Sequence, residues 1–158
     1  MELSAFIEED PLTALPGRSK FRMRMAKAIE KAHAAKIPAS LIILDINSFR
    51  ELNEIRGHEF GDEILKRVAK RLINIAPDNS IIGRLGDDEF ALLALDQETA
   101  DPIGGYASRL LLEIRRPYLI EGQKTDISLS MGLGILDDHD TADSLLYKSV
   151  AALYSAKR

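Results

Sequence analysis

The sequence predicts an α/β protein whose sheet is largely antiparallel. Apolar runs at residues 80–85 and 90–95 flank a short acidic turn, which is the pattern of a β-hairpin. Elsewhere, segments with apolar residues at helical spacing alternate with short apolar runs of the kind found in buried strands. The predicted order is helix, strand, helix, helix, strand, strand, helix, strand, strand, helix. This mixture of hairpins and crossovers indicates helices packed on an antiparallel sheet.

The first predicted helix and strand follow a turn-rich start. Residues 1–17 are polar and are interrupted by two prolines and a glycine, so no helix is expected there. Apolar side chains then recur at helical spacing over residues 18–36, and Pro38 marks the end of that helix. The apolar run at residues 39–46 predicts a buried strand.

Residues 48–77 predict a helix in two pieces, a short one and a longer one. Gly57 and Gly61 interrupt the helical pattern, so we expect the break at these glycines. The longer piece has a continuous apolar stripe along one face, and Pro77 follows its end. The acidic hairpin comes next.

The C-terminal part of the chain predicts two helices separated by two strands. The helices are expected over residues 99–115 and 141–157, the second with a threonine or aspartate as its N-cap. The strands are expected over residues 117–120 and 125–136.

Length, charge and cysteine content limit the function classes. A chain of 158 residues fits one domain with a sizeable core. Its net charge of −4 offers no general basic surface for a nucleic-acid polymer, and the lack of cysteine excludes disulfides and thiolate chemistry. No apolar run reaches the roughly 20 residues that span a bilayer, and the acidic N-terminus does not resemble a signal peptide. We therefore expect a cytoplasmic domain without membrane contact.

Three consecutive carboxylates, Asp87, Asp88 and Glu89, stand at the predicted tip of the hairpin. Two charges roughly 5 Å apart repel by about 3 kcal/mol at an effective dielectric constant near 20. Asp45 ends the first predicted strand, and it would join these acids at one sheet edge if that strand lies beside the hairpin. Mg²⁺ is held by one or two carboxylates together with phosphate oxygens and water. The cluster therefore fits a magnesium site, and acids solvated in an exposed turn are the alternative interpretation.

Five blocks of the sequence carry a resemblance to a known family. They are DPLTALPGR (10–18), LDINSFRELNEIRGHEFGDEIL (44–65), GRLGDDEFALL (83–93), ISLSMGLGI (127–135) and ALYSAK (152–157). In this order they resemble the GGDEF family, the diguanylate cyclase domain. The second block resembles the family's D-I-D-x-F-K and G-H-x-x-G-D motifs, and the third stands where its R-Y-G-G-D-E-F hairpin belongs.

The resemblance implies a palm-like nucleotidyl-cyclase fold, with a mostly antiparallel sheet of five strands flanked by about five helices. It covers residues 10–158 and leaves residues 1–9 as a lead-in. It also implies a reaction in which two domains, each holding GTP and Mg²⁺, face each other and form cyclic di-GMP with release of two pyrophosphates. The implied partners are GTP, a second copy of the domain, and an attached sensory or phosphodiesterase domain.

Matched residue by residue, the resemblance implies a metal and catalytic set. Asp45 and Asp88 match the metal-binding acids, with the Ile46 carbonyl as a further metal contact. Asp88, Glu89 and Arg50 take the catalytic positions. Arg50 stands where the family has a phosphate-facing lysine; both side chains are cationic, but arginine binds phosphate through a planar fork.

The resemblance also implies a nucleotide-binding set. Asn53 and Asp62 match residues that hydrogen-bond guanine, a base that offers both a carbonyl acceptor and N–H donors. Gly86 matches a glycine beside the ligand, where backbone can approach closely. Phe49 is either a wall of this pocket or a core residue of its helix. Lys157 matches a lysine that contacts phosphates, with a solvated terminal lysine as the alternative.

Several positions depart from the family pattern. Asp87 replaces the second glycine of G-G-D-E-F, and its carboxylate would add negative charge beside a triphosphate. Aspartate tolerates left-handed backbone better than most residues, so the turn itself is expected to survive. Ala14 replaces the glycine of the opening block. The R-x-x-D motif of product inhibition is replaced by PDNS at residues 77–80, so that form of inhibition is not expected.

Three functional hypotheses follow from the sequence. In the first, the chain is a degenerate GGDEF domain of cyclic di-GMP signalling that binds GTP or regulates an attached domain, with weak or no cyclase activity. In the second, it is an active diguanylate cyclase that tolerates Asp87. In the third, it binds no nucleotide and serves as a dimerisation or scaffold domain.

Overall fold

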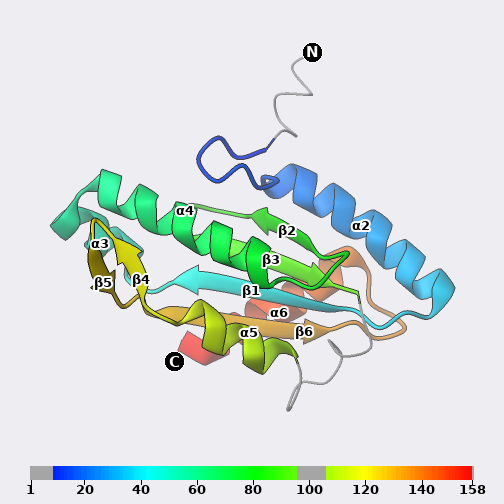
Figure 1. Ribbon diagram of the computed structural model, residues 1–158. Coiled ribbons are helices and arrows are strands. Elements are labelled where there is room, and N and C mark those ends of the chain that lie inside the picture. Colours follow the sequence, from blue (N-terminus) through cyan, green and yellow to red (C-terminus); the bar gives the residue numbers. More distant parts are fainter. Residues whose placement is uncertain (1–8, 96–105, 158) are drawn as a thin grey trace.

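The computed structural model describes residues 9–95 and 106–157, and it has the α/β architecture that the sequence predicts (Figure 1). Its main sheet has four antiparallel strands in the order β2 (Ile81–Arg84), β3 (Glu89–Ala94), β1 (Ser40–Ile46) and β6 (Leu129–Ile135). All seven residues of β1 are buried, as expected for a central strand with both faces covered. The predicted hairpin is confirmed as β2 and β3.

The sheet has four strands in the described residues, so the prediction of five is wrong on this point. The run at residues 117–120 forms β4 (Tyr118–Ile120), which pairs with β5 (Gln123–Thr125) in a separate hairpin. Glu121 and Gly122, with φ angles of 52° and 77°, join these strands. Two central residues with positive φ give a hairpin turn whose twist matches its strands. Strands β4 and β5 therefore pair with each other, and the chain joins the main sheet only with the next strand, β6 (Leu129–Ile135).

Helices cover both faces of the sheet. One face packs against α2 (Arg18–Ala35) and α6 (Ala142–Lys157), in a core that includes Leu41 and Ile43 of β1. The other face packs against α4 (His58–Ile75) and α5 (Tyr106–Ile114), in a core that includes Ile42 and Leu44. Successive side chains of a strand point to opposite faces, so one apolar strand supplies both cores. None of the helices within the described residues is long and apolar enough to cross a membrane.

The helix boundaries agree with most of the sequence signals. The break after α3 (Phe49–Arg56) falls at Gly57, whose φ angle of 94° favours glycine. Gly61, which was expected to share in the break, instead lies inside α4. Thr141 is the N-cap of α6, since its hydroxyl oxygen accepts a hydrogen bond from the Ser144 N–H at 3.1 Å. Part of the helix predicted over residues 99–115 lies outside the described residues.

A compact turn at residues 10–15 lies before α2. Asp10 organises it, because its carboxylate accepts hydrogen bonds from the backbone N–H and the hydroxyl of Thr13, both at 2.8 Å. Ala14, at the position where the resembling family has glycine, has a left-handed φ angle of 64°. The backbone N–H of Arg84 donates to the Pro16 carbonyl at 2.9 Å, which fixes this turn against the end of β2.

Candidate functional site

The acidic hairpin turn and Asp45 meet at one edge of the sheet. Asp45 of β1 lies opposite Glu89 of β3, so the condition under which Asp45 joins the acidic turn, a first strand beside the hairpin, is met. The backbone N–H of Ile46 donates to the Asp88 carbonyl at 3.1 Å, which joins the turn to the end of β1. Sheet pairing therefore brings together carboxylates that are more than forty positions apart in the sequence.

Asp45 is buried, with 7% of its surface exposed, and its two oxygens differ in their partners. Oδ2 accepts a hydrogen bond from the Lys157 ammonium at the end of α6. Oδ1 is buried without a hydrogen-bond partner among the described residues. A buried carboxylate oxygen without a partner is costly, and such an atom is a reason to look for a ligand.

The other two acids are held in an environment that disfavours their charged forms. Burial is the largest cause that raises the pKa of Asp88 above its usual range, and the Asp45 carboxylate adds to it. Burial and the same carboxylate also raise the pKa of Glu89. Lys157 offsets both effects only in part, since both pKa values remain raised. The site has more negative charge than its own cations neutralise, which favours a bound cation.

The donor set fits Mg²⁺ as part of a complex with phosphate. Within residues 9–95 and 106–157, no group of three or more acidic or histidine side chains is arranged to hold a metal ion without other ligands. Mg²⁺ does not require such a group, because it usually takes one or two carboxylates and completes its shell with water and substrate phosphates. The carboxylates of Asp45, whose Oδ1 has no partner among the described residues, and of Asp88 have the hard oxygen atoms that such a site requires.

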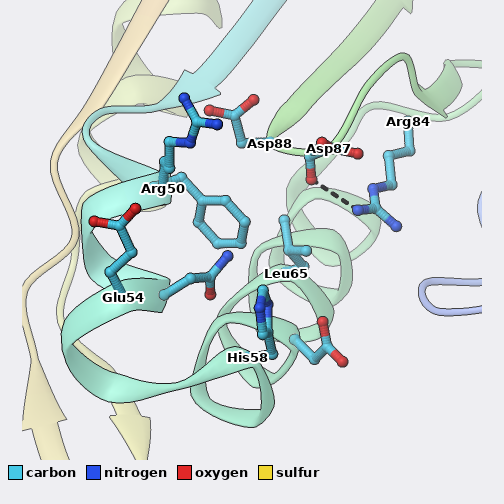
Figure 2. A pocket seen from close by; sticks show the side chains of 10 residues that line it. Arg50, Glu54, His58, Leu65, Arg84, Asp87 and Asp88 are labelled. Carbon is cyan, nitrogen blue, oxygen red and sulfur yellow. Dashed lines mark hydrogen bonds between the residues drawn. The ribbon is translucent and has the colours of Figure 1, made fainter.

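A cavity of about 590 Å³ opens next to these acids, between α3, α4 and the hairpin turn. This volume lies within the range of small-molecule sites. Figure 2 shows Arg50 and Asp88 at one end of the cavity and His58 at the other. The lining residues are Phe49, Arg50, Asn53, Glu54, His58, Asp62, Leu65, Arg84, Asp87 and Asp88.

Asn53 lies on the wall of this cavity and packs against Gly61. Its Oδ1 is buried without a hydrogen-bond partner among the described residues. A Cβ atom at position 61 would lie 1.7 Å from Asn53 Oδ1 and 3.2 Å from Phe49 Cζ. Gly61 is therefore required by the close approach of Asn53 rather than by a helix break.

The turn around Asp87 is stabilised by Arg84. The Arg84 side chain donates to the carbonyls of Gly86 and Asp87, at 3.1 and 2.7 Å, and forms an ion pair with Asp10 at 3.0 Å (Figure 2 draws the bond to Asp87). The φ angles of Gly86 and Asp87 are not positive, so this turn does not need glycine for its backbone conformation. The Asp87 side chain lies at the cavity wall and is exposed. At this position Asp87 therefore differs from glycine in its charged side chain and not in the backbone conformation that the turn requires.

The structure brings the predicted site residues together in two groups. Phe49, Arg50, Asn53, Asp62 and Asp88 line the cavity, and Phe49 is both a wall and a core residue. Asp45, Ile46, Glu89 and Lys157 belong to the sheet edge beside it. Gly86 does not line the large cavity but lines a smaller one of about 330 Å³ on the other side of the turn.

Sequence reasoning did not assign a binding role to four residues that line the cavity. They are Glu54, His58, Leu65 and Arg84. Helical spacing could have indicated Glu54, which follows Arg50 by one turn on α3. The role of Arg84 depends on its contacts with the Asp10 turn, which is distant in the sequence.

The chain is similar to known bacterial signalling proteins. It is 31% identical to the signalling protein YkoW of Bacillus subtilis over 99% of this chain and 20% of that protein. It is 30% identical to the diguanylate cyclase TpbB of Pseudomonas aeruginosa over 94% of this chain and 35% of that protein. The chain thus spans about a fifth to a third of the length of these curated relatives.

Solved structures give the same result. A sensory box/GGDEF family protein from Caulobacter crescentus superposes with a TM-score of 0.82 at 32% identity, covering 95% of this chain and 97% of that one. The GGDEF domain of DgcB from the same species, in complex with c-di-GMP, superposes with a TM-score of 0.84 at 26% identity, covering 95% and 90%. The family model described as diguanylate cyclase, GGDEF domain, matches residues 7–158. With the antiparallel sheet, the acidic turn and the adjoining cavity in place, the chain belongs to the GGDEF domain family.

Proposed function

We propose that this domain binds GTP together with Mg²⁺ and acts as a regulatory module of cyclic di-GMP signalling, with weak or no cyclase activity of its own. The observation that supports this most directly is a pair of buried oxygens that have no hydrogen-bond partner in the described part of the chain. Asp45 Oδ1 lies at the metal end of the site, and Asn53 Oδ1 lies against Gly61, behind the cavity wall that Asn53 helps to form. A metal–nucleotide complex would supply a cation to the first oxygen, and rotation of the Asn53 side chain would let the second accept a hydrogen bond from the ligand.

The charges of the cavity support a requirement for metal. Its lining contains four carboxylates, Glu54, Asp62, Asp87 and Asp88, against the two guanidinium groups of Arg50 and Arg84. This excess of negative charge would repel a triphosphate that arrives without a cation. Asp45, Asp88 and the Ile46 carbonyl are the groups that would hold Mg²⁺, which neutralises phosphate charge when it is bound.

The proposed roles of the other residues are those that the family resemblance implies, and the positions of these residues are compatible with them. Asn53 and Asp62 would bind the guanine edge, and Arg50 would contact phosphate at the end of the cavity near Asp88. Lys157 would exchange part of its contact with Asp45 for a phosphate oxygen. Asp87 adds a carboxylate at the cavity wall, close enough to contribute to the raised pKa of Asp88. This extra charge opposes nucleotide binding and turnover.

One observation favours active cyclase function as a second candidate. Because neither Gly86 nor Asp87 needs a positive φ angle, replacing glycine by Asp87 leaves the turn conformation accessible. The exposed Asp87 carboxylate is also partly screened by water. Active and regulatory functions therefore differ only in how strongly this one charge opposes the reaction.

Calorimetric titration with GTP, with and without Mg²⁺, tests the proposal, because binding requires only one copy of the domain. We expect Mg²⁺-dependent binding that is lost in Asp88→Ala and retained in Asp138→Ala, an exposed aspartate outside the cavity. Absence of binding at millimolar GTP would contradict the proposal and favour the scaffold hypothesis.

A cyclase assay with dimerisation enforced by a fused dimeric tag then separates the first two candidates. We expect little activity in the natural sequence and a gain in both Asp87→Gly and Asp87→Asn, since the two variants remove the same charge. A gain in Asp87→Gly alone would show that backbone conformation matters. Full activity of the unmodified domain would establish the active cyclase instead.

A further inference from the structure

A second hollow, of about 470 Å³, lies between α2 and β2 and shares no lining residue with the nucleotide cavity. Its apolar lining combines buried alanines of α2 with larger side chains that stay partly accessible. Ala28 and Ala32 are 9% and 2% exposed, whereas Ile37 is 42% exposed. Ile81 and Leu95 are half-buried and complete the apolar part. This groove is a concave apolar surface, which is the usual form of a binding site.

The groove is bordered by positive charge. Arg24, Lys27 and Lys31 are exposed and lie three and four residues apart on α2, so they follow one face of the helix over about 10 Å. Lys27 and Lys31 make no hydrogen bond or ion pair with any residue that the structure describes. No aspartate or glutamate of the described residues lines the groove. The border is therefore basic on a chain whose net charge is −4.

We propose that this groove docks an acidic amphipathic helix of another protein. Such a helix carries carboxylates at the same three- and four-residue spacing, which matches the cations of α2. Large apolar side chains on the same face would enter the hollow and cover Ile37 and Ile81, in the helix-in-groove mode of recognition. A flat lipid surface would leave the hollow unfilled, so the concave shape favours a protein segment over a membrane.

The test uses the purified chain without nucleotide, so its result is independent of the GTP proposal. The probe is a fluorescein-labelled peptide of roughly 18 residues, long enough to form a helix, with leucines and spaced glutamates on one face. A second peptide has glutamine in place of every glutamate. The domain variant is the double substitution Lys27→Glu and Lys31→Glu. Its matched control is Lys66→Glu with Lys70→Glu, two exposed lysines one helical turn apart on α4.

We expect saturable fluorescence anisotropy with the acidic peptide, weakened at least tenfold by the Lys27/Lys31 variant and unchanged by the Lys66/Lys70 control. The glutamine peptide should bind at least tenfold more weakly, and methyl NMR shifts should concentrate at Ile37, Ile81 and Leu95. The proposal is overturned by absence of saturable binding, by equal weakening in both variants, or by shifts outside the groove. Two further results would overturn it. One is self-association of the domain in analytical ultracentrifugation that the Lys27/Lys31 variant abolishes. The other is binding of the domain alone to anionic vesicles that the same variant abolishes.

Discussion

Helix α6 carries two lysines that each form an ion pair with a buried aspartate: Lys148 with Asp140, and Lys157 with Asp45. The two aspartates differ in how many other hydrogen bonds they accept. Asp140 accepts hydrogen bonds on both oxygens: Oδ1 from Ser144 at 2.7 Å, and Oδ2 from Lys148 at 2.5 Å and from the Asp137 N–H at 2.9 Å. Asp45 accepts one from Lys157, and its other oxygen has no partner within the described part of the chain.

Asp140 and the acids that neighbour Asp45 have pKa shifts of opposite sign. At Asp140, burial alone would raise the pKa, but the bonds from Lys148, the Asp137 N–H and Ser144 outweigh it and lower the pKa of Asp140. Beside Asp45, burial and repulsion raise the pKa of Asp88 and Glu89. A carboxylate whose two oxygens both accept hydrogen bonds stabilises the fold. A group of carboxylates with too few hydrogen bonds and too few neighbouring cations is instead typical of a ligand-binding site.

The largest effect on stability is expected at the fully partnered pair. Asp140→Asn should lower the free energy of unfolding by about 2 kcal/mol, because Lys148 and Ser144 lose a charged acceptor. Urea denaturation at neutral pH measures this change. Asp138→Asn, at an exposed neighbour, is the control and should change stability by less than about 0.5 kcal/mol. Equal effects of the two substitutions would contradict the comparison.

The same pair should make stability depend on acid. Because the folded-state pKa of Asp140 is lowered, its stabilisation is present above the unfolded pKa near 3.8 and is lost as the pH falls through the lower folded value. Urea midpoints measured from neutral pH down to roughly pH 2 should therefore fall less steeply in Asp140→Asn than in the natural sequence. A parallel fall in both proteins would assign the acid sensitivity to other carboxylates.

At the site, Gly61→Ala should reduce nucleotide affinity more than stability. The added Cβ would displace Asn53 Oδ1, which is the end of a movable side chain, so the fold can adjust. We expect GTP affinity to fall about tenfold, the value of one lost hydrogen bond, with a small change in melting temperature. Asn53→Ala provides the double-mutant cycle, and the two substitutions together should cost little more than Asn53→Ala alone. Additive losses would show that Gly61 acts by another route.

Removing the charge of Asp88 should change the free energy of unfolding in the opposite direction from removing the charge of Asp140. Asp88→Asn should raise the stability of the ligand-free domain at neutral pH, because its raised pKa means that the charged form is disfavoured in the folded state. The gain should not exceed about 1 kcal/mol, since the side chain is half-exposed and solvent screens it. The same variant should lose Mg²⁺-dependent GTP binding. If Asp88→Asn instead lowers the free energy of unfolding, the Asp88 carboxylate stabilises the fold as Asp140 does, and the prediction is wrong.

The smallest effect concerns the turn that supports Arg84 beside the site. Ala14 has a left-handed φ angle of 64°, which costs a residue with a Cβ atom more than it costs glycine. Ala14→Gly removes this conformational strain but increases the entropy of the unfolded chain. The net effect should be a rise of about 0.5 kcal/mol in the free energy of unfolding. Thermal and urea denaturation measure it, and Ala34→Gly, at an exposed position of helix α2, should instead destabilise the domain.

Much of the site was predictable because its parts lie in short continuous blocks. The acidic turn and Asp45 would meet if the first strand lay beside the hairpin, and the strand register shows that it does. The roles of Gly61 and Arg84 were not predictable in the same way. Gly61 seemed to mark a helix break, but it makes room for Asn53 on the preceding helix. Arg84 holds the acidic turn through Asp10, which lies 74 residues away.

The sequence by itself determined the kind and order of most secondary-structure elements, because apolar periodicity and turn residues act locally; it did not predict the short strand β5. It also determined the charge of the acidic turn. Only the tertiary structure decided that the main sheet has four strands, since the Glu121–Gly122 turn sends β4 back onto β5. It also decided which lysine pairs with Asp45, and which buried oxygens have no hydrogen-bond partner among the residues that the structure describes. Those outcomes depend on packing between segments that are distant in the sequence, and a local sequence pattern contains no information about that packing.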